Sequence, residues 1–119
     1  GSKLSMKVAV ASKGREMESE VSEVFGRSPY FIFVEVEGKE IKKAEAIENE
    51  SLEQRGGVGI SAARLVAEKG AEAVITGNIG PRAFSVLKQF NIEVYSKGKC
   101  KSVKEALEEF IEGKLERIA

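Results

Sequence analysis

The chain has 119 residues and contains no histidine, no aspartate and no tryptophan, so all nineteen of its carboxylate side chains are glutamates. Without histidine there is no imidazole base, no Ser–His or Cys–His nucleophile pair and no imidazole metal ligand. Catalytic magnesium is usually held by aspartates, which glutamates would have to replace here. These absences exclude most hydrolase mechanisms and favour a protein that binds its ligand without converting it.

Cysteine is equally scarce, because Cys100 is the single cysteine of the chain. One thiol excludes an internal disulfide and a site built from four thiolates. It can still serve as one soft ligand to an iron or molybdenum cluster, and Cys100 is our candidate metal ligand. The surrounding lysines predict a lowered pKa for its thiol. The alternative is a loop cysteine without a function.

Excess charge and long apolar runs are also missing. Nineteen basic residues balance nineteen acidic ones, so no overall positive field attracts nucleic acid, and we predict no such partner. No apolar run approaches the roughly 20 residues of a membrane span, which predicts a cytoplasmic protein without membrane contact. Abundant glutamate and lysine with little cysteine and methionine is typical of thermophile proteins.

Length and a hydrophobic fraction of 42% indicate one folded domain. We expect it to cover residues 6–116 and to be a monomer or a weak dimer. Residues 1–5 have the composition of an expression-tag remnant placed before a native Met6.

The first half of the chain has the pattern of strands. Residues 6–11 and 30–37 are dense in apolar and β-branched side chains, and the turn at Gly38 predicts an antiparallel hairpin with residues 40–47. Residues 13–24 and 48–55 are polar and predict loops, the first with a helical turn at residues 22–25.

The second half alternates helices with strands. Helices are predicted at residues 60–69 and 81–90 and from Ser102 onward, where Glu105 completes a capping box. Strands at residues 73–76 and 92–95 separate them, and repeated helix–strand units predict parallel pairing with right-handed crossovers. The order β-β-β-α-β-α-β-α predicts an α/β fold of the ribonuclease H-like type. Its mixed five-stranded sheet would include the antiparallel hairpin and carry helices on both faces.

Two glycine-rich turns precede two of these helices and are the candidate ligand site. The first contains Gly56, Gly57 and Gly59, and the second contains Gly77, Asn78, Gly80 and Arg82. Glycine permits a close approach to the main chain, and the first helical turn offers unpaired N–H groups at the positive end of the helix dipole. The alternative for the first turn is a tight helix entry that serves packing. Neither turn fits a P-loop or a dinucleotide fingerprint.

The second turn is the stronger candidate, because it follows a core strand at the edge where open α/β sheets bind ligands. Arg82 would lie in the first turn of a helix, where a cation is unfavourable and therefore indicates a counter-anion. The alternative for Arg82 is a surface arginine that tolerates this cost, which is only tenths of a kcal/mol. Arg27 follows Gly26 and precedes a strand, and its guanidinium suits phosphate or carboxylate. The alternative for Arg27 is a turn residue paired with a nearby glutamate.

Several segments in this order resemble the dinitrogenase iron-molybdenum cofactor biosynthesis family: residues 25–31, 56–59, 74–83 and 92–95 after a short first strand. The similarity extends over residues 6–116. It implies a ribonuclease H-like fold and carriers or chaperones that hold iron–sulfur or iron–molybdenum clusters, with cluster donor or acceptor proteins as partners. Some relatives use a histidine ligand that this chain lacks, which leaves Cys100 or electrostatic holding by N–H groups and arginines.

These observations lead to one main hypothesis and two alternatives. The main hypothesis is a small protein without catalytic residues that holds an anionic iron–sulfur or iron–molybdenum cluster, or another small anion, at the glycine turns. The first alternative is an enzyme that acts on a phosphorylated or nucleotide substrate at the same turns. The second is a protein–protein interaction module that uses the sheet edge or the last helix.

Overall fold

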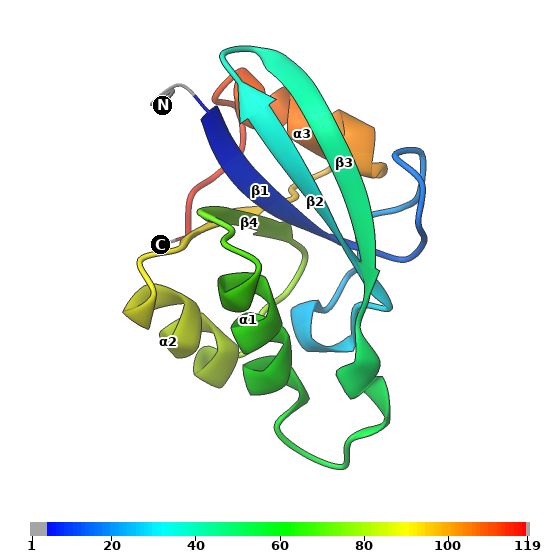
Figure 1. Cartoon of the computed structure of the whole chain (residues 1–119), viewed down its shortest axis with the longest axis vertical. Helices are drawn as coiled ribbons and strands as arrows, with labels where there is room; N and C mark the ends of the chain where they lie inside the picture. Colours follow the sequence, from blue (N-terminus) through cyan, green and yellow to red (C-terminus); the bar gives the residue numbers. More distant parts are fainter. Residues whose placement is uncertain (1–4, 119) are drawn as a thin grey trace.

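The computed structural model describes residues 5–118 of the chain (Figure 1). The expected tag remnant lies outside the described residues except for Ser5, which begins the first strand. The strands are β1 (Ser5–Ser12), β2 (Tyr30–Glu37), β3 (Glu40–Glu48), β4 (Ala73–Thr76) and β5 (Glu93–Ser96). The helices are α1 (Val58–Glu68), α2 (Pro81–Gln89) and α3 (Val103–Ile111), with two 3-10 turns, η1 (Phe25–Arg27) and η2 (Glu50–Glu53).

The five strands form one mixed sheet in the order β3-β2-β1-β4-β5. β1, β2 and β3 pair antiparallel, whereas β4 lies parallel to both β1 and β5. Gly38 has a φ of 62° in the hairpin turn between β2 and β3, a conformation that glycine adopts without strain. The predicted α/β fold with a mixed five-stranded sheet and three helices is confirmed, and its assignment to the ribonuclease H-like class stays a prediction.

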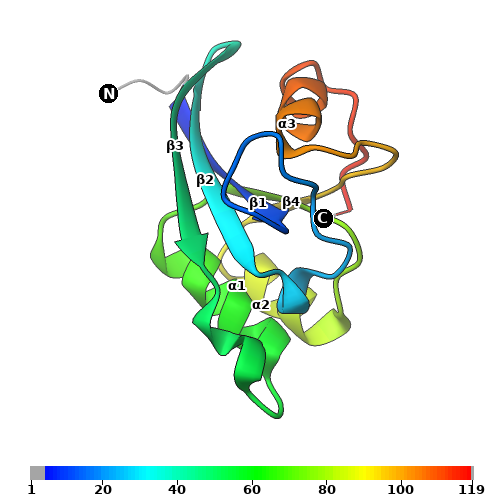
Figure 2. The ribbon, with the colours of Figure 1, turned by 90° about the vertical axis from the view of Figure 1, so that its right-hand side faces the viewer.

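The sheet separates two apolar cores, with α1 and α2 on one face and α3 on the other (Figure 2). Along β1, Ala9 and Ala11 belong to the core under α1 and α2, whereas Val8 and Val10 belong to the core under α3. This alternation follows from the two-residue period of a strand, and both faces are apolar because both are covered.

The segment predicted as a loop at residues 13–24 is held by the sheet through main-chain hydrogen bonds. Ser22 N–H donates to the Ala11 carbonyl over 2.9 Å, and Phe25 N–H donates to the Asn78 carbonyl over 2.8 Å. The segment therefore crosses the carboxyl ends of β1 and β4. Its helical turn lies at η1, not at residues 22–25.

The second predicted loop, residues 48–55, contains η2, whose start is capped by the buried Asn49 side chain. α1 begins at Val58, two residues before the predicted start, and β5 is shifted by one residue to Glu93–Ser96. These small boundary differences leave the element order unchanged.

The chain end covers the outer edge of β5. Ser96 N–H donates to the Glu116 carbonyl over 2.9 Å, and Ile118 N–H donates to the Val94 carbonyl over 2.7 Å. Pairing with the chain end satisfies main-chain groups of a strand that would otherwise be open to other chains. Within residues 5–118, none of the helices has the length and apolar character that crossing a membrane requires.

Candidate functional site

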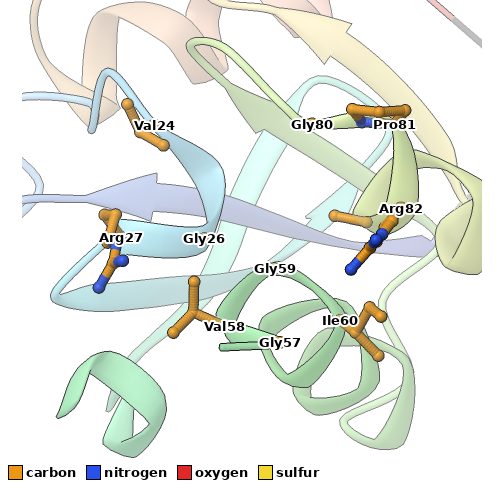
Figure 3. Close-up of a pocket in the computed structure, with 11 residues that line it drawn as sticks. Val24, Gly26, Arg27, Gly57, Val58, Gly59, Ile60, Gly80, Pro81 and Arg82 are labelled. Carbon is orange, nitrogen blue, oxygen red and sulfur yellow. The ribbon is translucent and has the colours of Figure 1, made fainter. Parts of the chain in front are cut away.

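A cleft of about 340 Å³ lies where α1 and α2 begin and where η1 packs against the start of α1 (Figure 3). Three segments that are far apart in the sequence therefore meet at one place. The residues that line the cleft are Val24, Gly26, Arg27, Gly57, Val58, Gly59, Ile60, Gly80, Pro81, Arg82 and Ala83.

These three segments approach one another closely because Gly26 and Gly59 have no side chains. A Cβ atom on Gly26 would lie 3.0 Å from the Gly59 Cα, and a Cβ atom on Gly59 would lie 3.3 Å from the Ala83 Cβ. Contacts of this kind are tighter than side chains tolerate without displacing a neighbour. The packing alternative for the first glycine turn therefore applies to Gly59, which also lines the cleft.

Both helices start at the cleft without a side-chain cap. The N-cap residue of α1 is Gly57, which has a left-handed φ of 72°, and the N-cap residue of α2 is Gly80. Neither glycine has a side chain that can accept the hydrogen bonds of the first turn. Those N–H groups have no acceptor inside the helix, and each helix start carries the positive end of its dipole. The cleft thus receives two partial positive charges.

Two arginines add full positive charges to the same cleft. Arg27 projects from η1 and Arg82 from the first turn of α2 (Figure 3). Arg27 donates one hydrogen bond, from a guanidinium NH to the Leu52 carbonyl over 3.3 Å. Among residues 5–118 neither arginine forms an ion pair, so the predicted alternative of an Arg27–glutamate pair is wrong.

The walls of the cleft are apolar, and this part of the site was not predicted from the sequence. Val24, Val58, Ile60 and Pro81 line the cleft together with the two arginines. No carboxylate is among the lining residues. The arrangement therefore combines apolar walls with positive charge only, which is suited to an anion that also has a weakly hydrated surface.

Gly77 and Asn78 lie outside the cleft because the chain itself occupies the place next to them. Gly77 N–H donates to the Ser22 carbonyl over 3.1 Å, and Asn78 N–H donates to the Glu23 carbonyl over 2.6 Å. A Cβ atom on Gly77 would lie 2.5 Å from that Glu23 oxygen. The segment that crosses the sheet edge therefore uses both N–H groups, which are not available to a ligand.

The predicted ligand-binding residues thus fall into two groups. Those that line the cleft are Arg27, Gly57, Gly59, Gly80 and Arg82, and those that do not are Gly56, Gly77 and Asn78. Gly56 directly precedes a lining residue, and its carbonyl accepts a hydrogen bond from the Gln54 side chain over 3.0 Å.

Cys100 lies on the opposite face of the sheet, in the core under α3, and is 5% exposed. Burial and the nearby carboxylates of Glu105 and Glu109 raise the pKa of its thiol, so the predicted lowering by lysines is wrong. Lys97 Nζ donates to the Cys100 carbonyl rather than to the thiol. No group of three or more potential metal-ligating carboxylates, thiols or imidazoles occurs within the described part of the chain.

Comparison with known families gives a match over most of the chain. The model of a family described as dinitrogenase iron-molybdenum cofactor matches residues 6–113. An uncharacterised protein of Methanocaldococcus jannaschii is 47% identical over 94 residues, which cover 79% of each chain.

Solved structures of similar fold include the apo form of the orange protein from Desulfovibrio gigas. It has a TM-score of 0.87 and 30% sequence identity, and the match covers 100% of this chain and 97% of that one. A NifB-like protein from Thermotoga has a TM-score of 0.79 and 33% identity over 95% of this chain and 93% of its own. The structural likeness therefore extends over the whole domain.

Proposed function

This chain belongs to the dinitrogenase iron-molybdenum cofactor family, and on that premise we propose that its cleft holds an anionic metal–sulfur cluster of the iron–sulfur or iron–molybdenum type. The cluster is a cargo that is bound and passed on, and the protein is a carrier rather than an enzyme. One observation carries the proposal: two uncapped helix starts and two arginines converge on a single cleft.

The lining residues of the cleft suit a cluster whose metal ions already carry all of their ligands. They are less suited to a cluster that needs metal ligands from the protein. The chain has no histidine, and its single thiol, Cys100, lies across the sheet from the cleft. N–H groups and guanidinium groups donate hydrogen bonds to anionic sulfur or oxygen without replacing it as a metal ligand. The apolar walls suit the large, polarisable sulfur atoms of such a cluster.

The same lining argues against chemistry at the cleft. Its eleven lining residues are glycines, apolar residues and two arginines. An arginine does not give up its proton in proteins, so none of the lining side chains can act as a general base. A phosphorylated compound remains the competing ligand, because phosphate is recognised by the same donors.

A carrier also needs partners, and we infer that cluster donor and acceptor proteins contact the open rim of the cleft. Arg27 and Arg82 are both exposed there. A cargo held by charge and hydrogen bonds alone can move between proteins without breaking a metal–protein bond. Release therefore requires only that the acceptor offers stronger ligands.

The test is anaerobic reconstitution of the protein with iron, sulfide and molybdenum, followed by desalting and determination of the metal and sulfide that remain bound. We expect coloured wild-type protein. Arg27→Ala and Arg82→Ala should each weaken retention about tenfold, since a hydrogen bond to a charged group contributes about 1.5–3 kcal/mol. Lys88→Ala removes a cation from α2 outside the cleft and should retain the cluster.

Two results would contradict the proposal. The first is colourless protein without bound metal. The second is retention that persists in both arginine variants and disappears in Cys100→Ser, because this would make the thiol the ligand. Thermal stabilisation by phosphate compounds in the absence of any cluster uptake would instead support the enzyme alternative.

A further inference from the structure

A second hollow, of about 350 Å³, lies between the later halves of α1 and α2, away from the cleft. Its lining residues are Arg64, Ala67, Glu68, Val86, Gln89 and Phe90. Phe90 follows the end of α2 and is 57% exposed, more than any other large apolar side chain in the described part of the chain. An exposed aromatic ring with small apolar neighbours and charged residues at its rim has the composition of an interaction surface.

The charges beside this hollow are of opposite sign and one helical turn apart. Arg64 and Glu68 both belong to α1, and their four-residue spacing places them on the same face of the helix as Ala67. Within residues 5–118, neither of them forms an ion pair. Both side chains are exposed, and their charges are therefore available to a partner.

The geometry points to a second copy of this chain as the partner. A twofold axis that passes α1 between these two charges places Arg64 of each copy opposite Glu68 of the other copy. A surface that carries these two opposite charges is thus complementary to a second copy of itself. A symmetric dimer requires a self-complementary surface of this kind. Ala67 lies near the axis, where a small residue allows the two helices to approach closely.

The apolar part of the surface follows the same symmetry. Val86 lies on α2 and Phe90 directly follows the end of that helix, and both line the hollow, so Phe90 of each copy can cover the hollow of the other. The guanidinium–carboxylate pairs then lie next to a desolvated aromatic contact, where Arg–carboxylate recognition is most selective.

The size of the surface sets the strength of this association. A stable interface buries about 800 Å² on each partner, whereas this surface is formed only by the later halves of two short helices and Phe90. The dimer is therefore weak and forms at high protein concentration. The cleft lies at the first turns of the same helices, so dimerisation leaves it open and does not depend on the cargo.

The experiment is sedimentation velocity of the full chain from micromolar to millimolar concentration. We expect wild-type protein to dimerise as the concentration rises. Arg64→Glu and Glu68→Arg each create two like-charge contacts and should each raise the dissociation constant about tenfold. The double variant R64E/E68R restores both opposite-charge contacts and should dimerise as wild type does. Phe90→Ser should remain monomeric.

The matched control is the pair Lys104→Glu and Glu108→Lys, which has the same spacing on the exposed face of α3 and should leave the dimer unchanged. The proposal is overturned if wild-type protein is monomeric at every concentration, or if the double variant is as weak as either single one. Arg82→Ala should dimerise normally and Phe90→Ser should retain the metal cluster, so failure here is distinguishable from failure of the proposed carrier function.

Discussion

The starts of the three helices differ in a way that separates the molecule into a closed and an open region. α3 begins with Ser102, whose hydroxyl oxygen accepts a hydrogen bond from Glu105 N–H over 3.0 Å. The Glu105 carboxylate in turn accepts from Lys101 N–H over 2.8 Å. α1 and α2 begin with Gly57 and Gly80 and have no such bonds.

Every helix leaves N–H groups of its first turn without an acceptor inside the helix. At the start of α3, which we call closed, side chains accept from these N–H groups, and at the open starts of α1 and α2 no side chain does so. A side-chain cap in place of Gly80 would stabilise α2 by a few tenths of a kcal/mol through its hydrogen bond, because glycine is itself a fair N-cap residue. Gly57 and Gly80 instead leave N–H groups available at the cleft between two arginines. The difference indicates that the chain forgoes local stability where a ligand would bind and keeps it elsewhere.

The turn between β4 and α2 contains one packed glycine, Gly77, and one glycine that lines the cleft, Gly80. Replacing each of them by alanine tests this difference. Gly77→Ala would push a Cβ atom to 2.5 Å from a backbone oxygen. We expect the free energy of unfolding to fall by about 3 kcal/mol, the upper end of the usual cost of overpacking. Urea unfolding followed by circular dichroism measures this loss.

Gly80→Ala is the matched control in the same turn, because nothing lies within 4 Å of the added Cβ atom and its φ of −75° is open to any residue. Its free energy of unfolding should change by less than about 1 kcal/mol. If Gly77→Ala and Gly80→Ala lowered the free energy of unfolding equally, the two glycines would not differ in packing as proposed.

Gly80→Asp converts an open helix start into a closed one. The extended N-cap conformation, with a φ of −75° and a ψ of 162°, allows the carboxylate to accept from the first turn of α2. We expect stability to rise by about 0.5–1 kcal/mol, while retention of an anionic cluster falls at least about tenfold, since the carboxylate takes the donors and faces Arg82. Thermal unfolding and metal retention measure the two effects on one protein.

Ser102→Ala is the reverse change at the closed start and should lower stability by about 1 kcal/mol without affecting retention. A Gly80→Asp variant that is both more stable and fully able to retain the cluster would remove the helix starts from the site. The arginines and the apolar walls would then have to account for binding.

The sequence predicted the sheet, the three helices and the capping box because these depend on local signals. Apolar alternation, turn glycines and the Ser102–Glu105 spacing act over a few residues. The same signals located Gly80 and Arg82 at a helix start. They also located Arg27 beside a glycine, and the structure brings it to the same cleft.

Gly77 and Asn78 are predicted ligand-binding residues that do not line the cleft, and the cause of this difference is not local in the sequence. Ligands usually bind beyond the carboxyl ends of parallel strands, and the position of these residues after β4 predicts contact with a ligand for that reason. In this chain the segment from Ser22 to Phe25 fills that place through pairing between residues more than fifty positions apart. Its polar composition gave no sign of strand-like pairing, so no local pattern could have revealed it.

The smallest predicted effect on stability is the pH dependence that comes from Cys100, which lies in the core under α3. Burial, Glu105 and Glu109 raise the pKa of its thiol in the folded protein. As the pH rises past about 8.5, the unfolded chain loses this proton first. The free energy of unfolding should therefore fall with rising pH, and the decline should continue until the folded thiol ionises as well. Burial and the hydrogen bond to Glu93 also raise the pKa of the Tyr95 hydroxyl.

Urea unfolding between about pH 7 and about pH 9.5 measures this slope, with Cys100→Ala as the control that removes the group and should flatten it. The sign of the slope decides between the two interpretations of this residue. Lysines that stabilised a thiolate would lower the folded pKa, and stability would then rise over the same interval. A rising slope that Cys100→Ala abolishes would make Cys100 a poised soft ligand and would move the candidate metal site to the α3 face.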